Sequence, residues 1–452
     1  MSDALNAYLD QHVNEAQHLL ELLCRQPSVA AQNLGIAEMA TLVETLLQDE
    51  GFTTQRLHAE GAPPVIYGEL RGSSPYTLLL YNHYDVQPPE PLDLWDSPPF
   101  EPTIRDGKFY ARGSADNKAE IATRLAAIRA LRATYGTLPI TLRWMIEGEE
   151  EIGSPHFEAI AAKYADLLRA DGVLWEGSNF DDEGRPHLVL GTKGMLYVQL
   201  DVQGTGVDAH SGAAPILPSA AWRLVQALAT LKTPEGNVLI PGFYDAVRPP
   251  SDAQLKALAE QDDTEEQKKM AYQVDHFVDN LTGLPLRVRE AFTPTCNIAG
   301  LLSGYTGEGT KTVLPAKAMA KIDFRLVPDQ DPQDIAKALQ QHLKDRGYDD
   351  IQVTVFGSAG PVVTPINDPF ARRIISIAEA FAGKPASISP ILGGTLPFLG
   401  AFQRYVGVPG LAAPGNAAYW GSRAHSPNEH IRLADLPRAV KYNCVMWEAL
   451  GK

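Results

Sequence analysis

The sequence predicts an α/β protein of two domains, in which a smaller α+β domain interrupts a larger domain built on a mixed sheet. Strand-like and helical segments alternate between about residues 65 and 190. After residue 190 the order of strands and helices becomes that of a ferredoxin-like unit. The α/β character returns near residue 361, so the predicted limits are 1–190 and 361–452 for the larger domain and 191–360 for the inserted one.

The chain begins with MSDALNAYLDQHVNEAQHLLELL, which has no basic segment followed by an apolar one and so does not look like an export signal. The spacing of its apolar residues predicts one amphipathic helix, with Leu5, Leu9, Val13, Leu19 and Leu20 on the buried face. No apolar run in the chain approaches the length that spans a membrane.

The first α/β segment contains three predicted strands and a helix. PYTLLLYNHYD is typical of a strand that ends in a loop, and NKAEIATRLAAIRALRATYG repeats apolar residues at helical spacing until Gly136. LPITLRWMIEGEEE indicates a strand followed by an acidic loop, and DGVLWEGS indicates a short strand followed by another loop.

The inserted segment starts after GTKGMLYVQLDVQG. We expect a helix near 217–231, a very polar stretch at 251–273, a strand at KAMAKIDFRLV, a helix near 332–346 and a strand at IQVTVFG. The last part of the chain then has a helix at DPFARRIISIAEAFAG and ends in YNCVMWEAL.

Composition excludes several classes of protein. A chain of 452 residues with 44% hydrophobic and 21% charged content is typical of a soluble protein with more than one core. The formal net charge of -16 argues against a nucleic acid or an anionic membrane surface as partner. Cys24, Cys296 and Cys444 are scattered, which argues against disulfides or a thiolate zinc site. We therefore expect a cytoplasmic protein that binds any metal through His and carboxylate.

Two polar clusters lie before the longest predicted helix. His83 and Asp85 lie where a predicted strand ends. One interpretation is a hydrogen-bonded structural pair. The other is that one ring nitrogen of His83 binds a metal while Asp85 accepts the N–H of the other ring nitrogen. Asp116 opens the helix, where an N-cap is one explanation and a carboxylate shared by two cations is the other.

Three more clusters follow later in the chain. EGEEEIGS sets Glu149, Glu150 and Glu151 side by side, either as a solvated acidic loop or as a group of ligands whose like charges need a cation. Glu176 in LWEGS and His425 in SRAHSPNEHIRL are each ordinary when taken alone. Four of the five clusters lie at the carboxyl ends of predicted strands, where open α/β sheets bind ligands. Gathered there, they would form one metal site or two that share a bridge.

Taken in order, the motifs resemble those of the M20 metallopeptidases, a family that includes carnosinase, cytosolic non-specific dipeptidase and aminoacylase-1. The resemblance covers nearly the whole chain and rests on HYDVQP, DGKFYARGSADNK, EGEEEIGS, WEGS, DAHSG, GGTLP and AHSPNE. PTCNIAGLLSGYTGEGTKTVLPAKAMAKIDFRLVP is most similar to the dipeptidase branch. The resemblance implies a catalytic domain of zinc-peptidase type and an inserted lid that also forms a dimer.

The family also implies two divalent metal ions. His83, Asp116 and Glu176 would bind one ion, and Asp116, Glu151 and His425 the other, so that Asp116 is the bridge. Zinc is the expected metal, and manganese or cobalt suits the same imidazole and carboxylate ligands. Glu176 stands where carnosinase-like members carry aspartate, a difference that bears on the choice of metal.

The catalytic roles follow from the same resemblance. Glu150 would be the general base that accepts a proton from water activated by the two ions. Asp85 would steady His83. His210, from DAHSG, would serve the neighbouring subunit's site as an oxyanion donor, which implies a homodimer formed through the lid. The alternative for His210 is an ordinary turn histidine.

Recognition of a substrate carboxylate would fall to Arg325, Asn297 and the backbone at Gly394 and Thr395, because a guanidinium matches a carboxylate in shape. A structural ion pair is the alternative for Arg325. Our hypothesis is a two-metal hydrolase that cleaves dipeptides or very short peptides. The alternatives are an N-acyl-amino-acid amidohydrolase and a non-catalytic member that binds amino acids, although every predicted ligand and base position is filled.

Overall fold

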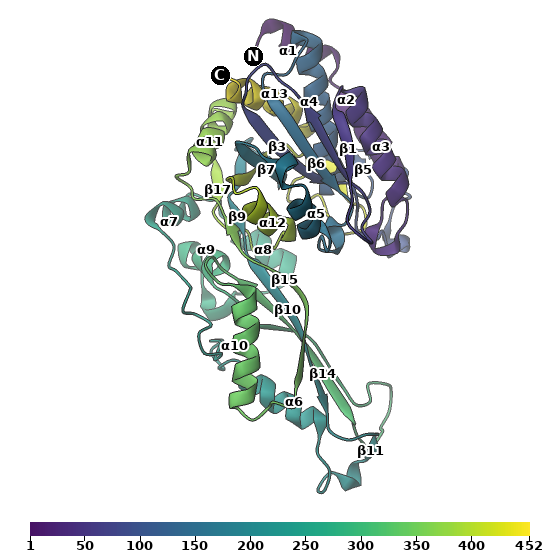
Figure 1. Cartoon of the computed structure of the whole chain (residues 1–452), viewed down its shortest axis with the longest axis vertical. Helices are drawn as coiled ribbons and strands as arrows, with labels where there is room; N and C mark the ends of the chain where they lie inside the picture. Colours follow the sequence, from purple (N-terminus) through teal and green to yellow (C-terminus); the bar gives the residue numbers. More distant parts are fainter.

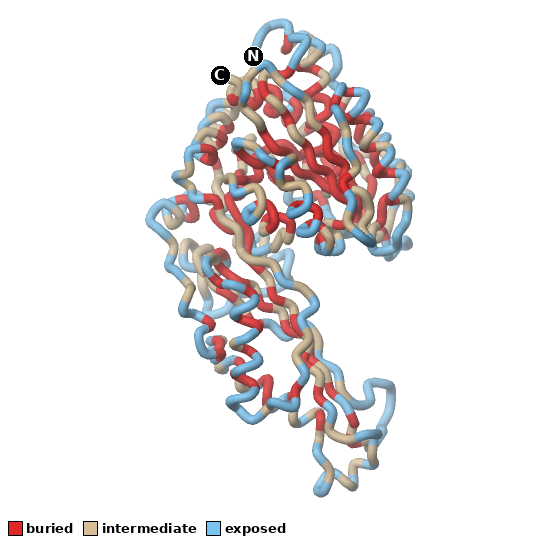
Figure 2. Tube along the Cα trace, viewed as in Figure 1, coloured by how far each residue is buried: buried red, intermediate tan, exposed pale blue.

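The computed structural model describes every residue from 1 to 452 and divides into two bodies, each built around its own sheet (Figure 1). The larger body takes its buried core from both ends of the chain, and the smaller body takes its core from the middle. Figure 2 shows that the buried segments concentrate in the strands of the two sheets.

The larger body contains an eight-stranded mixed sheet. In spatial order its strands are β1 (Thr53–Leu57), β2 (Val65–Leu70), β6 (Thr141–Glu147), β3 (Thr77–His83), β7 (Gly172–Ser178), β18 (Gly410–Pro414), β8 (His187–Val189) and β17 (Ser387–Ser389). The four central strands β6, β3, β7 and β18 are parallel to one another, so their carboxyl ends share one edge.

Helices cover both faces of this sheet. They are α1 (Asp3–Gln11), α2 (Glu15–Arg25), α3 (Ile36–Asp49), α4 (Ala119–Tyr135), α5 (Phe157–Lys163), α11 (Pro369–Ala382), α12 (Pro397–Tyr405) and α13 (Asp435–Leu450). Neighbouring residues of β3 show the two layers: the ring of Tyr81 stacks on Phe398 of α12, and the amide of Asn82 accepts from Arg124 of α4. Because successive side chains of a strand point to opposite faces, α4 and α12 lie on opposite sides of the sheet.

The N-terminal prediction of one continuous helix is wrong. Two helices, α1 and α2, are separated by a turn that contains Val13 and Asn14, both weaker helix formers than the leucines around them. Leu5, Leu19 and Leu20 are buried as expected, but the turn leaves the side chain of Val13 48% exposed.

The smaller body, which we call the lid, has a four-stranded antiparallel sheet in the order β12 (Asn297–Ser303), β14 (Lys317–Leu326), β10 (Gly194–Gln203) and β15 (Gln352–Ala359). Along the chain, α6 (Ala220–Ala229) follows β10 and α10 (Pro332–Asp345) follows β14. This order of elements and strands is ferredoxin-like, and it confirms the predicted fold class.

The polar stretch predicted at 251–273 forms helices inserted into the ferredoxin-like pattern. They are α7 (Asp252–Ala259) and α8 (Glu265–Tyr272), and α9 (Gly283–Phe292) follows before β12. α7 packs against α9 and against β17 of the larger body, so this insertion lies where the two bodies meet.

The chain passes between the two bodies through a pair of short strands. β9 (Gly191–Thr192) leads into the lid and pairs antiparallel with β16 (Val362–Val363), which leads out. A Cβ atom on Gly191 would lie 2.3 Å from the carbonyl oxygen of Val362, so only glycine permits this close approach.

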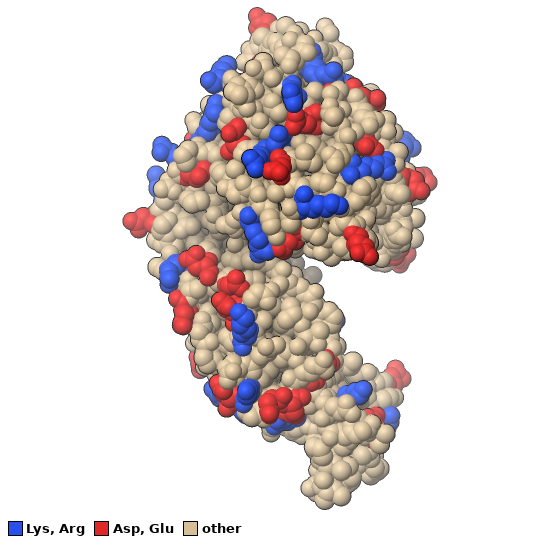
Figure 3. Space-filling model, in the orientation of Figure 1, with Lys and Arg blue, Asp and Glu red and all other residues tan.

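None of the helices combines the length and the hydropathy that crossing a lipid bilayer requires. On the face drawn in Figure 3, acidic and basic side chains are interspersed and no extended basic stripe is seen.

Candidate metal centre

The carboxyl edge of the parallel strands brings together ligands that lie far apart in the sequence. His83 is the last residue of β3 and pairs with Glu147, the last residue of β6. Glu176 lies near the end of the neighbouring strand β7. Asp116 reaches the same edge from the turn before α4, where the Asp116–Asn117 peptide bond is cis.

The five predicted ligands form one chain of close contacts centred on Asp116. The Nε2 atom of His83 lies 3.1 Å from Oδ1 of Asp116 and 3.4 Å from Oε2 of Glu176. The other oxygen of Asp116, Oδ2, lies 3.0 Å from Nε2 of His425, which is 3.2 Å from Oε2 of Glu151. Asp116 therefore stands between a His83–Glu176 group and a His425–Glu151 group.

The electrostatics of this cluster indicate a need for bound positive charge. Burial raises the pKa of Glu176 well above its usual range and raises the pKa of Glu150 to about 7. Burial lowers the pKa of His83, but the carboxylates around it outweigh that effect and the net direction is upward. The Asp116 and Glu151 carboxylates, which accept from its ring, raise the pKa of His425 to about 10. The protein thus holds several acidic groups together where they are largely removed from water.

The donor set fits divalent cations. The ligand atoms of His83, Asp116 and Glu151 all lie within 4.8 Å of one another, and so do those of His83, Glu150 and Glu176. Imidazole nitrogen with carboxylate oxygen is a combination that zinc, manganese and cobalt accept. Two such ions would supply the missing countercharge, and Asp116 has one oxygen directed to each group.

Asp85 holds both His83 and the acidic loop. The Nδ1–H of His83 donates to the backbone carbonyl of Asp85 at 2.9 Å, whereas the carboxylate expected to accept it lies farther away, at 3.4 Å. That carboxylate instead accepts the backbone N–H groups of Glu150 at 3.2 Å and Glu151 at 3.0 Å. Because a carbonyl can only accept, Nδ1 carries the proton in the neutral ring, and Nε2 of that ring has its lone pair facing the cluster.

The three adjacent glutamates have different surroundings. Glu150 faces the cluster, with Oε2 at 4.0 Å from Nε2 of His83. Glu151 reaches His425 and accepts at 2.9 Å from the side-chain amide of Gln87. Glu149 is a buried partner of His156 at 2.9 Å, so it is neither a ligand nor part of a solvated loop. Only Glu150 and Glu151 therefore contribute to the site.

Buried polar residues contact Glu176 and its backbone neighbours, and this network was not predicted from the sequence. The amide of Asn117 donates to the Glu176 carboxylate. Arg124 and Glu120, an ion pair one turn apart in α4, bind the backbone on either side of Glu176: Arg124 donates to the carbonyl of Trp175 at 3.3 Å, and Glu120 accepts from the N–H that follows Glu176 at 3.1 Å. These contacts fix the end of β7.

The predicted substrate-binding residues lie at the junction of the two bodies. Arg325, at the end of β14, donates from Nη1 to Oγ1 of Thr395 at 2.9 Å, and its Nε lies 3.5 Å from Asp323. Gly394 is exposed beside Thr395. Asn297 is exposed on β12, in register with Asp323 of β14. The structure thus brings Arg325 and Thr395 into contact, with Asn297 on the next strand.

His210 lies apart from the other candidates within one chain. It belongs to the short strand β11 (Ala209–His210), which pairs with β13 (Val313–Leu314) at the far end of the lid (Figure 1). The ring is exposed; its Nδ1 accepts the N–H of Gly212 at 3.0 Å, and its Nε2 lies 3.5 Å from Oγ1 of Thr312.

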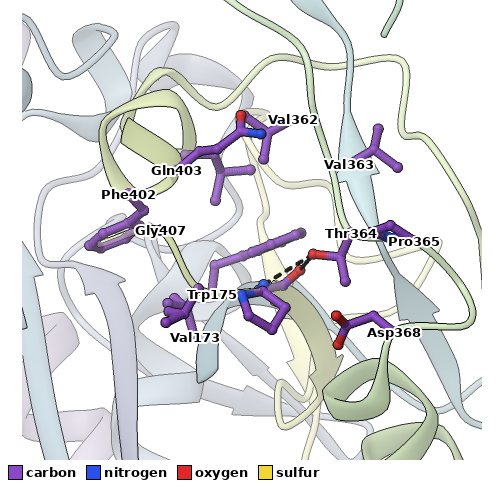
Figure 4. Close-up of a pocket in the computed structure, with 14 residues that line it drawn as sticks. Val173, Trp175, Val362, Val363, Thr364, Pro365, Asp368, Phe402, Gln403 and Gly407 are labelled. Carbon is purple, nitrogen blue, oxygen red and sulfur yellow. Dashed lines mark hydrogen bonds between the residues drawn. The ribbon is translucent and has the colours of Figure 1, made fainter. Parts of the chain in front are cut away.

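A cavity of about 280 Å³ between β7, β16, α12 and β18 is distinct from the metal centre (Figure 4). Its walls include Val173, Trp175, Val362 and Phe402, and Thr364 is hydrogen-bonded to Gly410 at its edge. None of the predicted site residues lines it. The charged cluster is therefore the better candidate for chemistry.

Comparison with known proteins places this arrangement among metallopeptidases. The model of the peptidase family M20/M25/M40 matches residues 79–449. The chain is 30% identical to the Beta-Ala-His dipeptidase of Mus musculus, with 86% of this chain and 80% of the relative covered. It is 29% identical to a Cys-Gly metallodipeptidase of Candida albicans, with 90% and 88% covered.

Two solved structures are similar over almost the whole chain. An M20 family metallo-carboxypeptidase from Sulfolobus solfataricus has a TM-score of 0.91 at 34% identity, with 97% of this chain and 99% of that chain covered. Human carnosine dipeptidase 1 has a TM-score of 0.79 at 25% identity, with 99% of both chains covered.

Proposed function

The chain belongs to the peptidase family M20/M25/M40, and from that premise we propose that it is a two-metal hydrolase of dipeptides and very short peptides. Its relatives include dipeptidases that act on β-alanyl-histidine and cysteinyl-glycine, as their names state. The observation that carries the proposal is the convergence of two histidines and two glutamates on Asp116, with a further, half-buried carboxylate, Glu150, beside them.

We assign one ion to His83, Asp116 and Glu176 and the other to Asp116, Glu151 and His425. The contacts described above support this division, because each histidine lies against a different oxygen of Asp116. Zinc is the proposed metal, and manganese and cobalt are compatible with the same ligands.

Glu150 is the proposed acid–base group. When bound, the two ions lower the pKa of water and polarise the scissile carbonyl. The Glu150 carboxylate accepts the proton of the attacking water and delivers it to the leaving amine. Asp85 supports this step because its carboxylate holds the backbone N–H of Glu150, so base and ligands keep a fixed relative position.

Arg325, Asn297, Gly394 and Thr395 are the proposed site for the substrate's terminal carboxylate. A guanidinium with one donor on Thr395 still has donors free for a bidentate contact. A free carboxylate next to the scissile bond is common to dipeptides and N-acyl amino acids, so this site alone does not separate the two substrate classes.

We further propose a cytoplasmic homodimer in which the lid of one subunit supplies His210 to the other subunit's metal centre. The exposed position of His210 at the far end of the lid supports a role outside its own chain. There its imidazole would donate to the oxyanion that forms as water adds to the carbonyl.

Mixed dimers test this assignment. His210→Ala is expected to lower kcat by about 10²- to 10³-fold, the usual cost of losing an oxyanion donor. Mixing His210→Ala subunits with Glu150→Gln subunits should restore about a quarter of wild-type activity, because half of the randomly paired dimers are mixed and each has one complete site. The readout is dipeptide hydrolysis after subunit exchange. Inactive mixed dimers would show that His210 does not act across the interface.

A substrate panel with controlled metal tests the function itself. Protein stripped by a chelator is expected to be inactive and to regain dipeptidase activity when zinc, manganese or cobalt is added. We expect dipeptides to be cleaved at least about tenfold faster than N-acetyl amino acids, and dipeptide amides, which lack the carboxylate, to be poor substrates. Turnover of N-acetyl amino acids alone would make the chain an amidohydrolase, and binding of amino acids without any turnover would make it a non-catalytic member.

The similarity to a metallo-carboxypeptidase supports a second candidate, the removal of the C-terminal residue from longer peptides. Both activities need the same carboxylate contact and differ in the space left for the substrate's amino end. Tripeptides and N-blocked dipeptides in the same panel distinguish them, since a carboxypeptidase would accept both.

A further inference from the structure

Glu429 lies buried where the two separate parts of the larger domain meet. It directly precedes β19 (His430–Arg432), which pairs with β5 (Lys108–Tyr110). This pairing brings Glu429 beside Ala111, whose N–H donates to the Glu429 carbonyl at 3.2 Å. Residues that are more than 300 positions apart in the sequence are thus neighbours at the entrance to the Asp116 turn.

The carboxylate of Glu429 accepts four hydrogen bonds. Oε1 accepts the backbone N–H groups of Ala115 at 2.8 Å and Asp116 at 3.1 Å. Oε2 accepts the backbone N–H of Gly113 at 2.9 Å and Nη1 of Arg112 at 2.7 Å. The side chain is 1% exposed, so water has no access to these acceptors. Three of the four donors belong to the turn that presents the bridging carboxylate.

Arg112 extends the same arrangement to the other ligand loop. Its side chain is also 1% exposed, and its Nη1 donates to the carbonyl of Ser426, the residue after His425, at 3.4 Å. Its Nη2 donates to the carbonyl of Pro88 at 3.1 Å. The Glu429–Arg112 pair therefore contacts the backbone of the Asp116 turn and the backbone of the His425 loop at once.

Buried ion pairs are usually a weak source of stability, because removing two charges from water costs about as much as their attraction returns. The hydrogen bonds of the Glu429–Arg112 pair instead go to the two loops that carry metal ligands, which indicates a role in positioning those ligands. His83 and Glu176 are held by other groups, Asp85 and Asn117, and do not touch Glu429. The residues that depend on Glu429 are Asp116, which the two proposed ions share, and His425, which belongs to the second ion alone.

We propose that Glu429 is a positioning residue of the metal centre, which sets the orientation of Asp116 and, through Arg112, its spacing from His425. It would contact neither substrate nor metal. The inference rests on the proposed two-metal function and adds that the Asp116–Glu151–His425 site depends on Glu429 more strongly than the His83–Asp116–Glu176 site does.

The test is metal binding by the full-length Glu429→Gln variant. Glutamine keeps the size of the side chain but turns one acceptor into an N–H₂ group that opposes the backbone donors. Titration of metal-free protein with Zn²⁺ by calorimetry, and with Co²⁺ by absorption spectroscopy, is expected to show one of the two ions bound about 10- to 100-fold more weakly, the usual effect of losing a ligand's support. The affinity for the other ion should change much less.

Glu50→Gln is the matched control. Glu50 is buried at 3% exposure and pairs with Arg129 and Arg132, away from the metal ligands. This variant should lower the melting temperature and leave the affinities for both ions unchanged. Glu429→Asp, which keeps the charge, should recover part of the lost affinity. If Glu429→Gln does not fold, Arg112→Lys is titrated instead and is expected to weaken the same ion.

The outcomes separate the inference from the function on which it rests. Wild-type affinity for both ions in Glu429→Gln, or an equal loss at both sites that Glu50→Gln reproduces, overturns the positioning role alone. Failure of the wild-type protein to bind divalent ions overturns the proposed function and the positioning role with it.

Discussion

Replacing Glu150 with glutamine is expected to lower kcat for dipeptides by about 10²- to 10⁴-fold while both metal ions stay bound. Glutamine has the shape of glutamate but cannot accept the proton of the attacking water. The residue faces the metal cluster, 4.0 Å from the His83 ring, and Asp85 holds its backbone in place. The measurement is steady-state kinetics together with metal analysis by mass spectrometry on the same protein sample.

Glu149→Gln is the control for this substitution. Glu149 is the preceding residue with the same side chain, but its carboxylate pairs with His156 and not with the cluster. We expect the kcat of Glu149→Gln to remain within about threefold of wild type, because substitutions that do not touch the catalytic groups have small effects. Activity that survives Glu150→Gln, or that falls equally in both variants, would refute Glu150 as the base.

Replacing Asp116 with alanine is expected to remove both ions and reduce activity to background. Each oxygen of this carboxylate lies against a different histidine, at 3.1 Å and 3.0 Å, so both sites lose a ligand at once. The four remaining ligands would also be left without the group that connects them. The measurement is the number of ions bound per chain after dialysis against a trace of zinc.

His425→Ala serves as the comparison for this experiment, because it belongs to one group only. It should leave about one ion per chain, bound by His83, Asp116 and Glu176. An Asp116→Ala protein that still binds one ion at wild-type affinity would show that the two sites do not share this carboxylate.

The larger features of the fold were accessible from sequence because they depend on local periodicity. The run TLLL before His83, and the helix that follows Asp116, both appear where their patterns predict them. The acidic loop and Glu176 also lie at the ends of predicted strands. Because the carboxyl ends of parallel strands share one edge of a sheet, the prediction could bring these residues together. His425 was found only through the family's motif order, since the loop that carries it has no periodicity.

The hydrogen bonds that hold the ligands in place could not be predicted from the sequence in the same way. Glu429 is in the quoted motif AHSPNE, yet its contact with the Asp116 turn depends on strand pairing across more than 300 residues. Asp85 was expected to hold the His83 ring with its carboxylate, but the backbone carbonyl does so and the carboxylate holds the acidic loop. Such choices among nearby acceptors are decided by three-dimensional packing. No spacing in the chain encodes them.

The two ends of the lid lie at different distances from the paired strands β9 and β16, through which the chain enters and leaves it. Arg325 lies in register with Met195 at the start of β10, close to β9 and β16. His210 lies at the opposite end of the lid. Any rotation of the lid about these strands would displace the imidazole of His210 farther than the guanidinium of Arg325, because displacement grows with distance from the axis. The proposed contact of Arg325 with a substrate's carboxylate would therefore be less sensitive to such a rotation than the proposed contact of His210 with the other subunit's site.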